Sequence, residues 1–186
     1  MINAALARRI KLVALDVDGV LTDGGIYLGA VDGRPLEFKR YDIQDGLGIY
    51  LLHRAGLRVA IITGRVSDSV RMRATELEIE DVAQVIDAYK LPVFTDMIER
   101  HGIAPAEVAY VGDDFPDLAV MRVVGLAVAT GNAVPEIKQE AGHVLTREGG
   151  RGAVREFAEA LLRSRGEWGA LWRDYVNKRS TRDAVR

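Results

Sequence analysis

Short apolar segments alternate with amphipathic segments along most of this 186-residue chain, and no other feature constrains its fold as strongly. The apolar segments are rich in Val, Ile, Leu and Ala, which is typical of strands buried on both faces of a parallel sheet. They cover residues 11–17, 57–63, 82–86, 108–112 and 126–130, with a weaker one at 143–146. Helical patterns at 45–56, 67–79, 90–102, 114–125 and 152–166 lie between them. This alternation predicts βαβ units and an α/β fold, a doubly wound Rossmann-like parallel sheet. The first of these helices is expected to begin at Asp45 as its N-cap.

The segment at 25–41 departs from this rhythm. Two β-prone stretches flank "VDGR" at 31–34, and Asp-Gly is a strong signal for a tight hairpin turn. We therefore predict a β-hairpin inserted after the first strand, in place of a cap domain. The domain prediction is a single domain over residues 1–166, followed by a tail at 167–186 that forms a peripheral helix or is disordered.

Composition and charge exclude several classes of partner. The chain is 48% hydrophobic and 28% charged, with a net charge of −2 and no cysteine. A near-neutral chain has no electrostatic basis for binding nucleic acid or an anionic membrane. The N-terminal apolar stretch is broken by Asp16 and resembles neither a signal peptide nor a membrane span. We expect a cytoplasmic protein without nucleic-acid or membrane partners.

Polar side chains follow four of the predicted strands at the point where each strand ends. In chain order they are Asp16 and Asp18, then Thr63, Gly64 and Arg65, then Lys90, and finally Asp113, Asp114 and Asp117. Ligands of open α/β sheets bind beyond the carboxyl ends of the strands. These four segments are therefore predicted to converge on one site. Asp23, which follows shortly after, is interpreted as a turn residue.

The residue types at this edge indicate phosphoryl transfer. Clustered carboxylates repel one another unless a cation joins them, and an all-oxygen ligand set suits Mg²⁺. A carboxylate beside Mg²⁺ can attack phosphorus and form an aspartyl-phosphate. A second carboxylate, two residues on, can protonate the leaving alcohol and then activate water. Thr63 and Lys90 can hold the phosphoryl oxygens as charge spreads in the transition state.

Four motifs in this order resemble those of the haloacid dehalogenase superfamily: D-V-D-G-V at 16–20, I-T-G-R at 62–65, Lys90, and G-D-D-x-x-D at 112–117. Stretches such as "DVDGVLTDGGIY", "YVGDD" and "GGRGAVREF" resemble more closely its small capless (C0) subfamily, typified by 3-deoxy-D-manno-octulosonate 8-phosphate phosphatase. The resemblance covers about residues 11–162. It implies that Asp16 is the nucleophile and Asp18 the general acid/base. It also implies that Asp16, Asp113 and the Asp18 main-chain carbonyl bind Mg²⁺.

The resemblance further implies a substrate and an assembly. The substrate is a phosphorylated 2-keto-3-deoxy sugar acid, 3-deoxy-D-manno-octulosonate 8-phosphate. The assembly is a homotetramer in which the hairpin helps to cover a neighbouring subunit's site. The residues expected to contact the substrate are Gly64, Arg65, Arg73, Asp42, Gln44, Asp45 and Gly46, with Asp114 and Asp117 in supporting roles.

Several positions depart from the subfamily's pattern. Gln44 and Tyr50 stand where arginines are expected to face the sugar acid. The segment "YDIQD" at 41–45 is closer to that of related domains associated with nine-carbon sialic-type sugars. Likewise, Ile86-Asp87 replaces the Gln-Gly expected before the lysine. A nine-carbon nonulosonate 9-phosphate is therefore an alternative substrate.

Two other classes of protein share parts of this pattern. A catalytically silent domain for oligomerisation or regulation would be expected to lose the nucleophile, the acid/base, the threonine or the lysine, whereas this chain keeps all four. A phospho-receiver domain also combines Asp, Thr, Lys and Mg²⁺. Its phosphoacceptor should follow a central strand and its acidic pair the first, which is not the order seen here.

Overall fold

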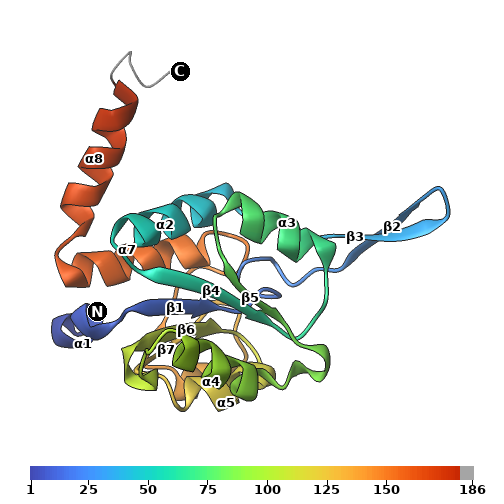
Figure 1. Cartoon of the computed structure of the whole chain (residues 1–186), viewed down its shortest axis with the longest axis horizontal. Helices are drawn as coiled ribbons and strands as arrows, with labels where there is room; N and C mark the ends of the chain where they lie inside the picture. Colours follow the sequence, from blue (N-terminus) through green and yellow to red (C-terminus); the bar gives the residue numbers. More distant parts are fainter. Residues whose placement is uncertain (181–186) are drawn as a thin grey trace.

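In the computed structural model, which describes residues 1–180, six parallel strands form one sheet in the order β5-β4-β1-β6-β7-β8 (Figure 1). The strands are β1 (Leu12–Leu15), β4 (Arg58–Thr63), β5 (Asp81–Gln84), β6 (Val108–Gly112), β7 (Leu126–Ala129) and β8 (His143–Val144). Every residue of β1, β6 and β7 is buried. The predicted parallel α/β fold is confirmed.

The helices form a layer on each face of this sheet. One layer contains α1 (Ala4–Arg9), α2 (Ile43–Arg54), α3 (Asp68–Glu76) and α7 (Ala153–Arg165), whose apolar residues share one core. The other contains α4 (Lys90–Arg100), α5 (Leu118–Met121) and α6 (Pro135–Glu140), which share a second core (Figure 1). Three short 3₁₀ turns, η1 (Ile86–Ala88), η2 (Pro105–Glu107) and η3 (Phe115–Asp117), lie in the connections.

Helices α2 and α7 pack closely because glycine stands at their contact. A Cβ at Gly48 would lie 3.0 Å from the Arg155 Cα atom, so a larger residue would push the helices apart. Helix α2 also begins earlier than predicted. Its N-cap is Asp42, whose side chain accepts a hydrogen bond from the Gln44 N–H. The prediction of Asp45 as N-cap is wrong, because Asp45 lies in the first turn and is buried against α7.

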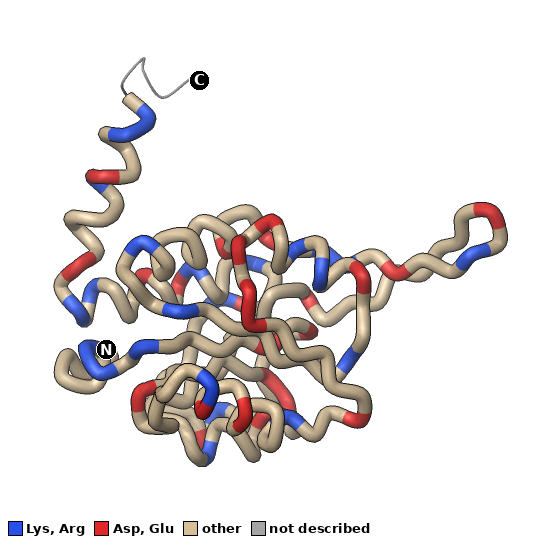
Figure 2. The backbone as a smooth tube through the Cα atoms, in the orientation of Figure 1, with Lys and Arg blue, Asp and Glu red and all other residues tan. Residues whose placement is uncertain are grey.

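The predicted hairpin is confirmed as β2 (Tyr27–Val31) and β3 (Arg34–Phe38). Its turn residues Asp32 and Gly33 have φ values of 50° and 75°, a combination that favours Asp-Gly. The hairpin projects from the body (Figure 1), and its charged residues lie at its tip and near its base (Figure 2). Leu28 is 78% and Phe38 56% exposed.

Helix α8 (Trp168–Ser180) follows α7 and extends away from the sheet (Figure 1). Trp168 is buried, with the Arg155 and Arg163 guanidinium groups 5.1 and 5.3 Å from its ring centroid. Part of the predicted tail is therefore a helix, and residues 181–186 lie outside the described residues. Across residues 1–180, the helices are too short or too polar for any to cross a membrane.

The strand order places a topological switch point between β1 and β6. From β1 the chain proceeds to β4 and β5, then crosses back to β6 and continues in the opposite direction to β7 and β8. Connections that leave in opposite directions open a crevice at the carboxyl ends of the two strands. Asp16 follows β1 and Asp113 follows β6, so both lie at this crevice.

Candidate active site

A cavity of about 450 Å³ opens at the carboxyl edge of the sheet. It brings together residues from all four predicted segments. Its lining comprises Asp16, Asp18, Gly19, Asp23, Gly24, Thr63, Gly64, Arg65, Ala88, Lys90, Asp113, Asp114, Pro116 and Asn132. The crevice that the topology predicts is thus a real hollow lined by acids, a lysine and an arginine.

Lys90 lies between two buried carboxylates. Its Nζ atom is 2.7 Å from Asp16 Oδ1 and 2.7 Å from Asp117 Oδ1. Lys90 is 3% exposed, Asp16 7% and Asp117 not at all. Burial alone lowers the pKa of Lys90, but the two carboxylates outweigh it and raise that pKa above its usual value. Lys90 therefore remains a cation that neutralises part of a buried acidic cluster.

Asp117 holds the loop after β6 in place. Its Oδ1 atom also accepts a hydrogen bond from the buried Tyr110 hydroxyl at 2.7 Å. Its Oδ2 atom accepts from the Asp113 N–H at 2.9 Å and the Asp114 N–H at 3.3 Å. With both oxygens engaged, Asp117 is suited to positioning the neighbouring groups rather than to binding a ligand directly. Asp114 has a local role as well, since its Oδ1 atom accepts from the Phe115 N–H.

Burial and mutual repulsion raise the pKa values of the acids that face the cavity. Burial is the main cause for Asp16, and Asp117 adds to it; Lys90 acts in the opposite direction, and the resulting pKa is about 7. Burial, followed by the nearby Asp16, raises the pKa of Asp113 to about 8. Two carboxylates that resist ionisation side by side are a place where a cation binds favourably.

The donor set fits a divalent cation with a preference for oxygen. Carboxylate oxygens of Asp16, Asp113 and Asp117 lie within 4.8 Å of one another. Cysteine is absent from the sequence, and hard oxygen ligands suit Mg²⁺ better than softer metals. Because Asp117 is already engaged by Lys90 and backbone groups, Asp16 and Asp113 are the side chains open to an ion.

The turn after β1 is built around a glycine in a left-handed conformation. Gly19 has a φ of 84°, and a Cβ there would overlap the Asp113 carboxylate. Its carbonyl accepts hydrogen bonds from Asn132 Nδ2 at 3.0 Å and Thr130 Oγ1 at 3.3 Å. The loop after β7 therefore holds the loop that carries Asp16 and Asp18. Only glycine allows the chain to pass this close to Asp113.

Comparisons with known proteins agree with this geometry. Residues 86–156 match the family of haloacid dehalogenase-like hydrolases. The 3-deoxy-D-manno-octulosonate 8-phosphate phosphatase KdsC of Escherichia coli K12 is 44% identical over 163 residues, which are 88% of this chain and 85% of the relative. The chain belongs to the haloacid dehalogenase-like phosphatases. Within them it is a member of the 3-deoxy-D-manno-octulosonate 8-phosphate phosphatase family.

Two solved structures show the same fold as this phosphatase. The 3-deoxy-D-manno-octulosonate 8-phosphate phosphatase of Moraxella catarrhalis was solved in complex with magnesium ion, phosphate ion and a KDO molecule. It has a TM-score of 0.87 and 37% identity, and the match covers 92% of this chain and 97% of that one. The 3-deoxy-D-manno-octulosonate 8-phosphate phosphatase of Yersinia pestis has a TM-score of 0.84 and 37% identity, and the match covers 89% of this chain and 88% of that one.

Thr63, Gly64 and Arg65 lie at the end of β4, where the predicted motif places them. Thr63 is buried, and its Oγ1 atom accepts a hydrogen bond from the Arg65 N–H at 3.4 Å. A Cβ at Gly64 would lie 2.9 Å from the Ala88 Cβ, so a glycine lets the loop before Lys90 approach. These three residues line the cavity of the phosphatase beside Asp16 and Lys90.

The other residues predicted to bind substrate lie outside this cavity. Asp42 caps α2, and its carbonyl accepts from Arg73 Nη2 at 3.2 Å. Arg73 also pairs with Glu76, and Gly46 leaves the room that the Arg73 guanidinium occupies. Asp45 accepts from the Arg155 N–H at 2.7 Å. These contacts join α2 to α3 and α7, so substrate binding at Asp42, Asp45, Gly46 and Arg73 stays a prediction.

Gln44 and Tyr50, which stand where the subfamily pattern has arginines, also lie away from the cavity. Gln44 Oε1 accepts a hydrogen bond from Arg147 Nη1 at 2.8 Å. The Tyr50 ring contacts that of Tyr175 on α8 edge to face, with centroids 5.6 Å apart. Tyr50 thus helps to hold α8 against α2.

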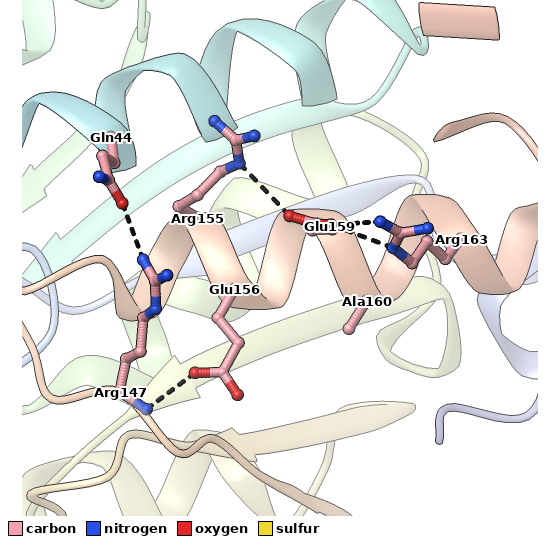
Figure 3. Close-up of a pocket in the computed structure, with 7 residues that line it drawn as sticks. All are labelled: Gln44, Arg147, Arg155, Glu156, Glu159, Ala160 and Arg163. Atoms are coloured by element: carbon pink, nitrogen blue, oxygen red, sulfur yellow. Dashed lines mark hydrogen bonds and ion pairs between the residues drawn. The ribbon is translucent and has the colours of Figure 1, made fainter. Parts of the chain in front are cut away.

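Gln44 belongs to a second cavity, of about 480 Å³, which lies beside α7 (Figure 3). Two of its arginines form hydrogen bonds, Arg147 with Gln44 and Arg163 with Glu159 at 2.5 Å. Arg155 forms a longer ion pair, with its Nε atom 3.7 Å from Glu159 Oε2. Both Glu156 oxygens accept hydrogen bonds from backbone N–H groups at 146 and 147. The paired charges in Figure 3 indicate a charged helix face rather than a second phosphoryl site.

The sequence patterns predicted no site role for several residues that lie in or beside the cavity. Asn132 follows the fifth predicted strand, so the rule applied to the first four strands would have found it. Asp23 forms its predicted turn, accepting from the Gly25 N–H, but it also lines the cavity. Tyr110 is a polar residue inside a predicted apolar strand, and its hydroxyl is the only sequence signal that it carries. Lys39, which ion-pairs with Asp18, carried no signal at all.

Proposed function

We propose that this phosphatase hydrolyses a phosphorylated 2-keto-3-deoxy sugar acid, 3-deoxy-D-manno-octulosonate 8-phosphate, through an aspartyl-phosphate on Asp16. The observation that carries the proposal is the buried ion pair of Asp16 with Lys90, beside Asp113 at the switch point. An acid, a cation and a divalent-metal site within one cavity are what phosphoryl transfer requires. The 44% identity to KdsC of E. coli supports the choice of substrate.

The reaction has two steps, each with its own proton transfer. First, an Asp16 oxygen attacks phosphorus, the bond to the leaving oxygen breaks, and that oxygen takes a proton from Asp18. Second, water attacks the aspartyl-phosphate while Asp18 accepts its proton, which releases phosphate and restores Asp16. Lys90 neutralises Asp16 so that a phosphate dianion can approach it. We expect the Thr63 hydroxyl and the Gly64 N–H, from two residues that line the cavity, to donate hydrogen bonds to the phosphoryl oxygens.

Mg²⁺ is the proposed cofactor, held by Asp16, Asp113 and the Asp18 main-chain carbonyl. Bound there, it would offset the charge of the carboxylates and of the phosphoryl oxygens. The raised pKa values of Asp16 and Asp113 support the site. The magnesium ion in the related Moraxella catarrhalis structure supports the identity of the metal.

We also propose a homotetramer in the cytoplasm, in which the hairpin helps to cover a neighbouring subunit's site. The hairpin supports this, since Tyr27, Leu28, Val31, Leu36 and Phe38 are 39% to 78% exposed. A projecting, apolar hairpin is costly in water and is stabilised by burial against another chain. Light scattering after size exclusion tests the assembly, and a monomer at micromolar concentration would contradict it.

The test of function is release of inorganic phosphate with Mg²⁺ present. The substrates are the eight-carbon sugar-acid phosphate, a nine-carbon nonulosonate 9-phosphate, which the "YDIQD" segment favours, and glucose 6-phosphate. We expect the highest kcat/KM with the eight-carbon ester. Asp16→Asn should lower kcat by at least about 10³-fold, whereas Asp96→Asn, an isosteric change at an exposed position of α4, should not. No turnover of any ester would refute the proposal, and a preference for the nine-carbon ester would replace the substrate.

A further inference from the structure

Lys39 lies at the base of the hairpin and contacts Asp18 in the candidate active site. The Lys39 side chain is fully buried and forms an ion pair with Asp18 Oδ1. Its Nζ atom also lies 3.3 Å from Glu37 Oε1. Burying a lysine is costly unless its charge is paired. The two acids around Lys39 provide that pairing.

Arg65 closes these contacts into a ring. Its Nη2 atom donates to Glu37 Oε2 at 2.5 Å, and its Nε atom lies 3.8 Å from Asp18 Oδ2. Two acids and two bases therefore alternate around the ring, Asp18–Lys39–Glu37–Arg65. Burial raises the pKa of Glu37, but Arg65 and Lys39 outweigh it and lower that pKa. Glu37 is thus ionised and holds both cations beside Asp18.

The two oxygens of Asp18 are held unequally. Oδ1 accepts a hydrogen bond from Lys39, whereas Oδ2 has, among residues 1–180, only the longer ion pair with Arg65. Asp18 lines the cavity, and its side chain is 25% exposed. A carboxyl group fixed through one oxygen keeps the other available for proton transfer at a constant position.

We propose that Lys39 is a positioning residue for Asp18, holding its carboxyl group where it exchanges a proton with the leaving oxygen. The inference rests on the proposed function, in which Asp18 is the acid/base. Glu37 and the hairpin act through Lys39, so the hairpin serves the chemistry of its own subunit in addition to any contact with a neighbour.

Comparing two leaving groups distinguishes a positioning role of Lys39 from a merely structural one. When an alkyl phosphate reacts, the electron pair of the breaking P–O bond goes to an oxygen that needs a proton from Asp18. The oxygen of p-nitrophenyl phosphate leaves as a stable anion and does not need that proton. Loss of an acid-positioning residue should therefore impair the alkyl ester far more than the nitrophenyl ester.

The experiment compares kcat/KM for the two esters, since this ratio covers the steps up to departure of the leaving group. We expect Lys39→Met to lower it about 10- to 100-fold for 3-deoxy-D-manno-octulosonate 8-phosphate and less than about 3-fold for p-nitrophenyl phosphate. Lys39→Arg should recover most of the activity. Lys178→Met, which removes an exposed lysine paired with Asp174 on α8, should leave both values unchanged.

A double-mutant cycle tests whether Lys39 acts through Asp18. In an Asp18→Asn background, Lys39→Met should cause no further loss of kcat/KM for 3-deoxy-D-manno-octulosonate 8-phosphate, the ester on which the single change is expected to act. Equal losses for both esters, additive losses in the cycle, or a rise in KM alone would overturn the proposal. No turnover by the wild-type enzyme would instead refute the proposed function itself, so the two failures are distinguishable.

Discussion

Asp45 lies in the first turn of α2 and is buried against the start of α7. Its ionisation should therefore destabilise the folded protein. The residue is 1% exposed. Its Oδ1 atom accepts a hydrogen bond from the Arg155 N–H at 2.7 Å, whereas Oδ2 has no partner among the described residues. The N-cap of α7 is Gly152, which has no side chain, so Asp45 caps the helix from α2.

Burial raises the pKa of Asp45 from 3.8 to about 6, although the backbone hydrogen bond from Arg155 acts in the opposite direction. Between pH 4 and 6 the folded protein therefore keeps a proton that the unfolded chain has lost. The free energy of unfolding must fall as pH rises through this window. A shift of about two units corresponds to about 3 kcal/mol, which is fully lost above about pH 6.

Asp45→Asn removes this titration while keeping an oxygen for the Arg155 N–H. The free energy of unfolding of the wild type minus that of the variant should fall by about 3 kcal/mol between pH 3.5 and 7. Groups that titrate in both proteins cancel in this difference. Urea unfolding, followed by tryptophan fluorescence, measures it, because Trp168 is buried next to α7.

Asp96→Asn is the matched control, since the same chemical change is made at an exposed position on α4. Its difference from the wild type should stay within about 0.5 kcal/mol over the same pH range. A difference for Asp45→Asn that is equally flat would refute the assignment of Asp45 as a buried carboxyl that resists ionisation.

Three further predictions concern the cavity itself. Lys90→Met leaves two buried carboxylates without their cation. It should lower the free energy of unfolding by about 3–5 kcal/mol at pH 8 and the activity at least about 100-fold. Urea unfolding and phosphate release measure these losses, and an active variant would contradict the role of Lys90. Gly19→Ala forces a Cβ onto the Asp113 carboxylate and should weaken Mg²⁺ binding at least about 10-fold in calorimetry. Gly33→Ala is the control, because Gly33 also has a positive φ but lies in open space. It should cost only about 1 kcal/mol in the free energy of unfolding. The Mg²⁺ affinity should fall as pH drops from 8 to 6, because protons then occupy Asp16 and Asp113. An affinity independent of pH would refute the pKa assignments.

The strands, the hairpin and the convergence of Asp16, Lys90 and Asp113 could be predicted from the sequence, because each depends on local patterns and on one topological rule. Apolar runs buried on both faces become parallel strands, and parallel strands bring their carboxyl ends to one edge. Asp-Gly at 32–33 specifies its turn through backbone conformation alone. The family resemblance could also be found from the sequence, because it depends on four short local motifs and their order.

Only the tertiary structure decided which side chains meet across long distances in the chain. Asp45 and Arg155 are 110 residues apart, and their contact depends on α2 packing against α7, which no local pattern encodes. Lys39 reaches Asp18 because the hairpin base folds back over the first loop. Local propensity acts over a few residues, whereas the ionisation of a buried acid depends on whatever the packing places beside it. The sequence alone therefore determined the class of chemistry, and the packing decided how its acids are held.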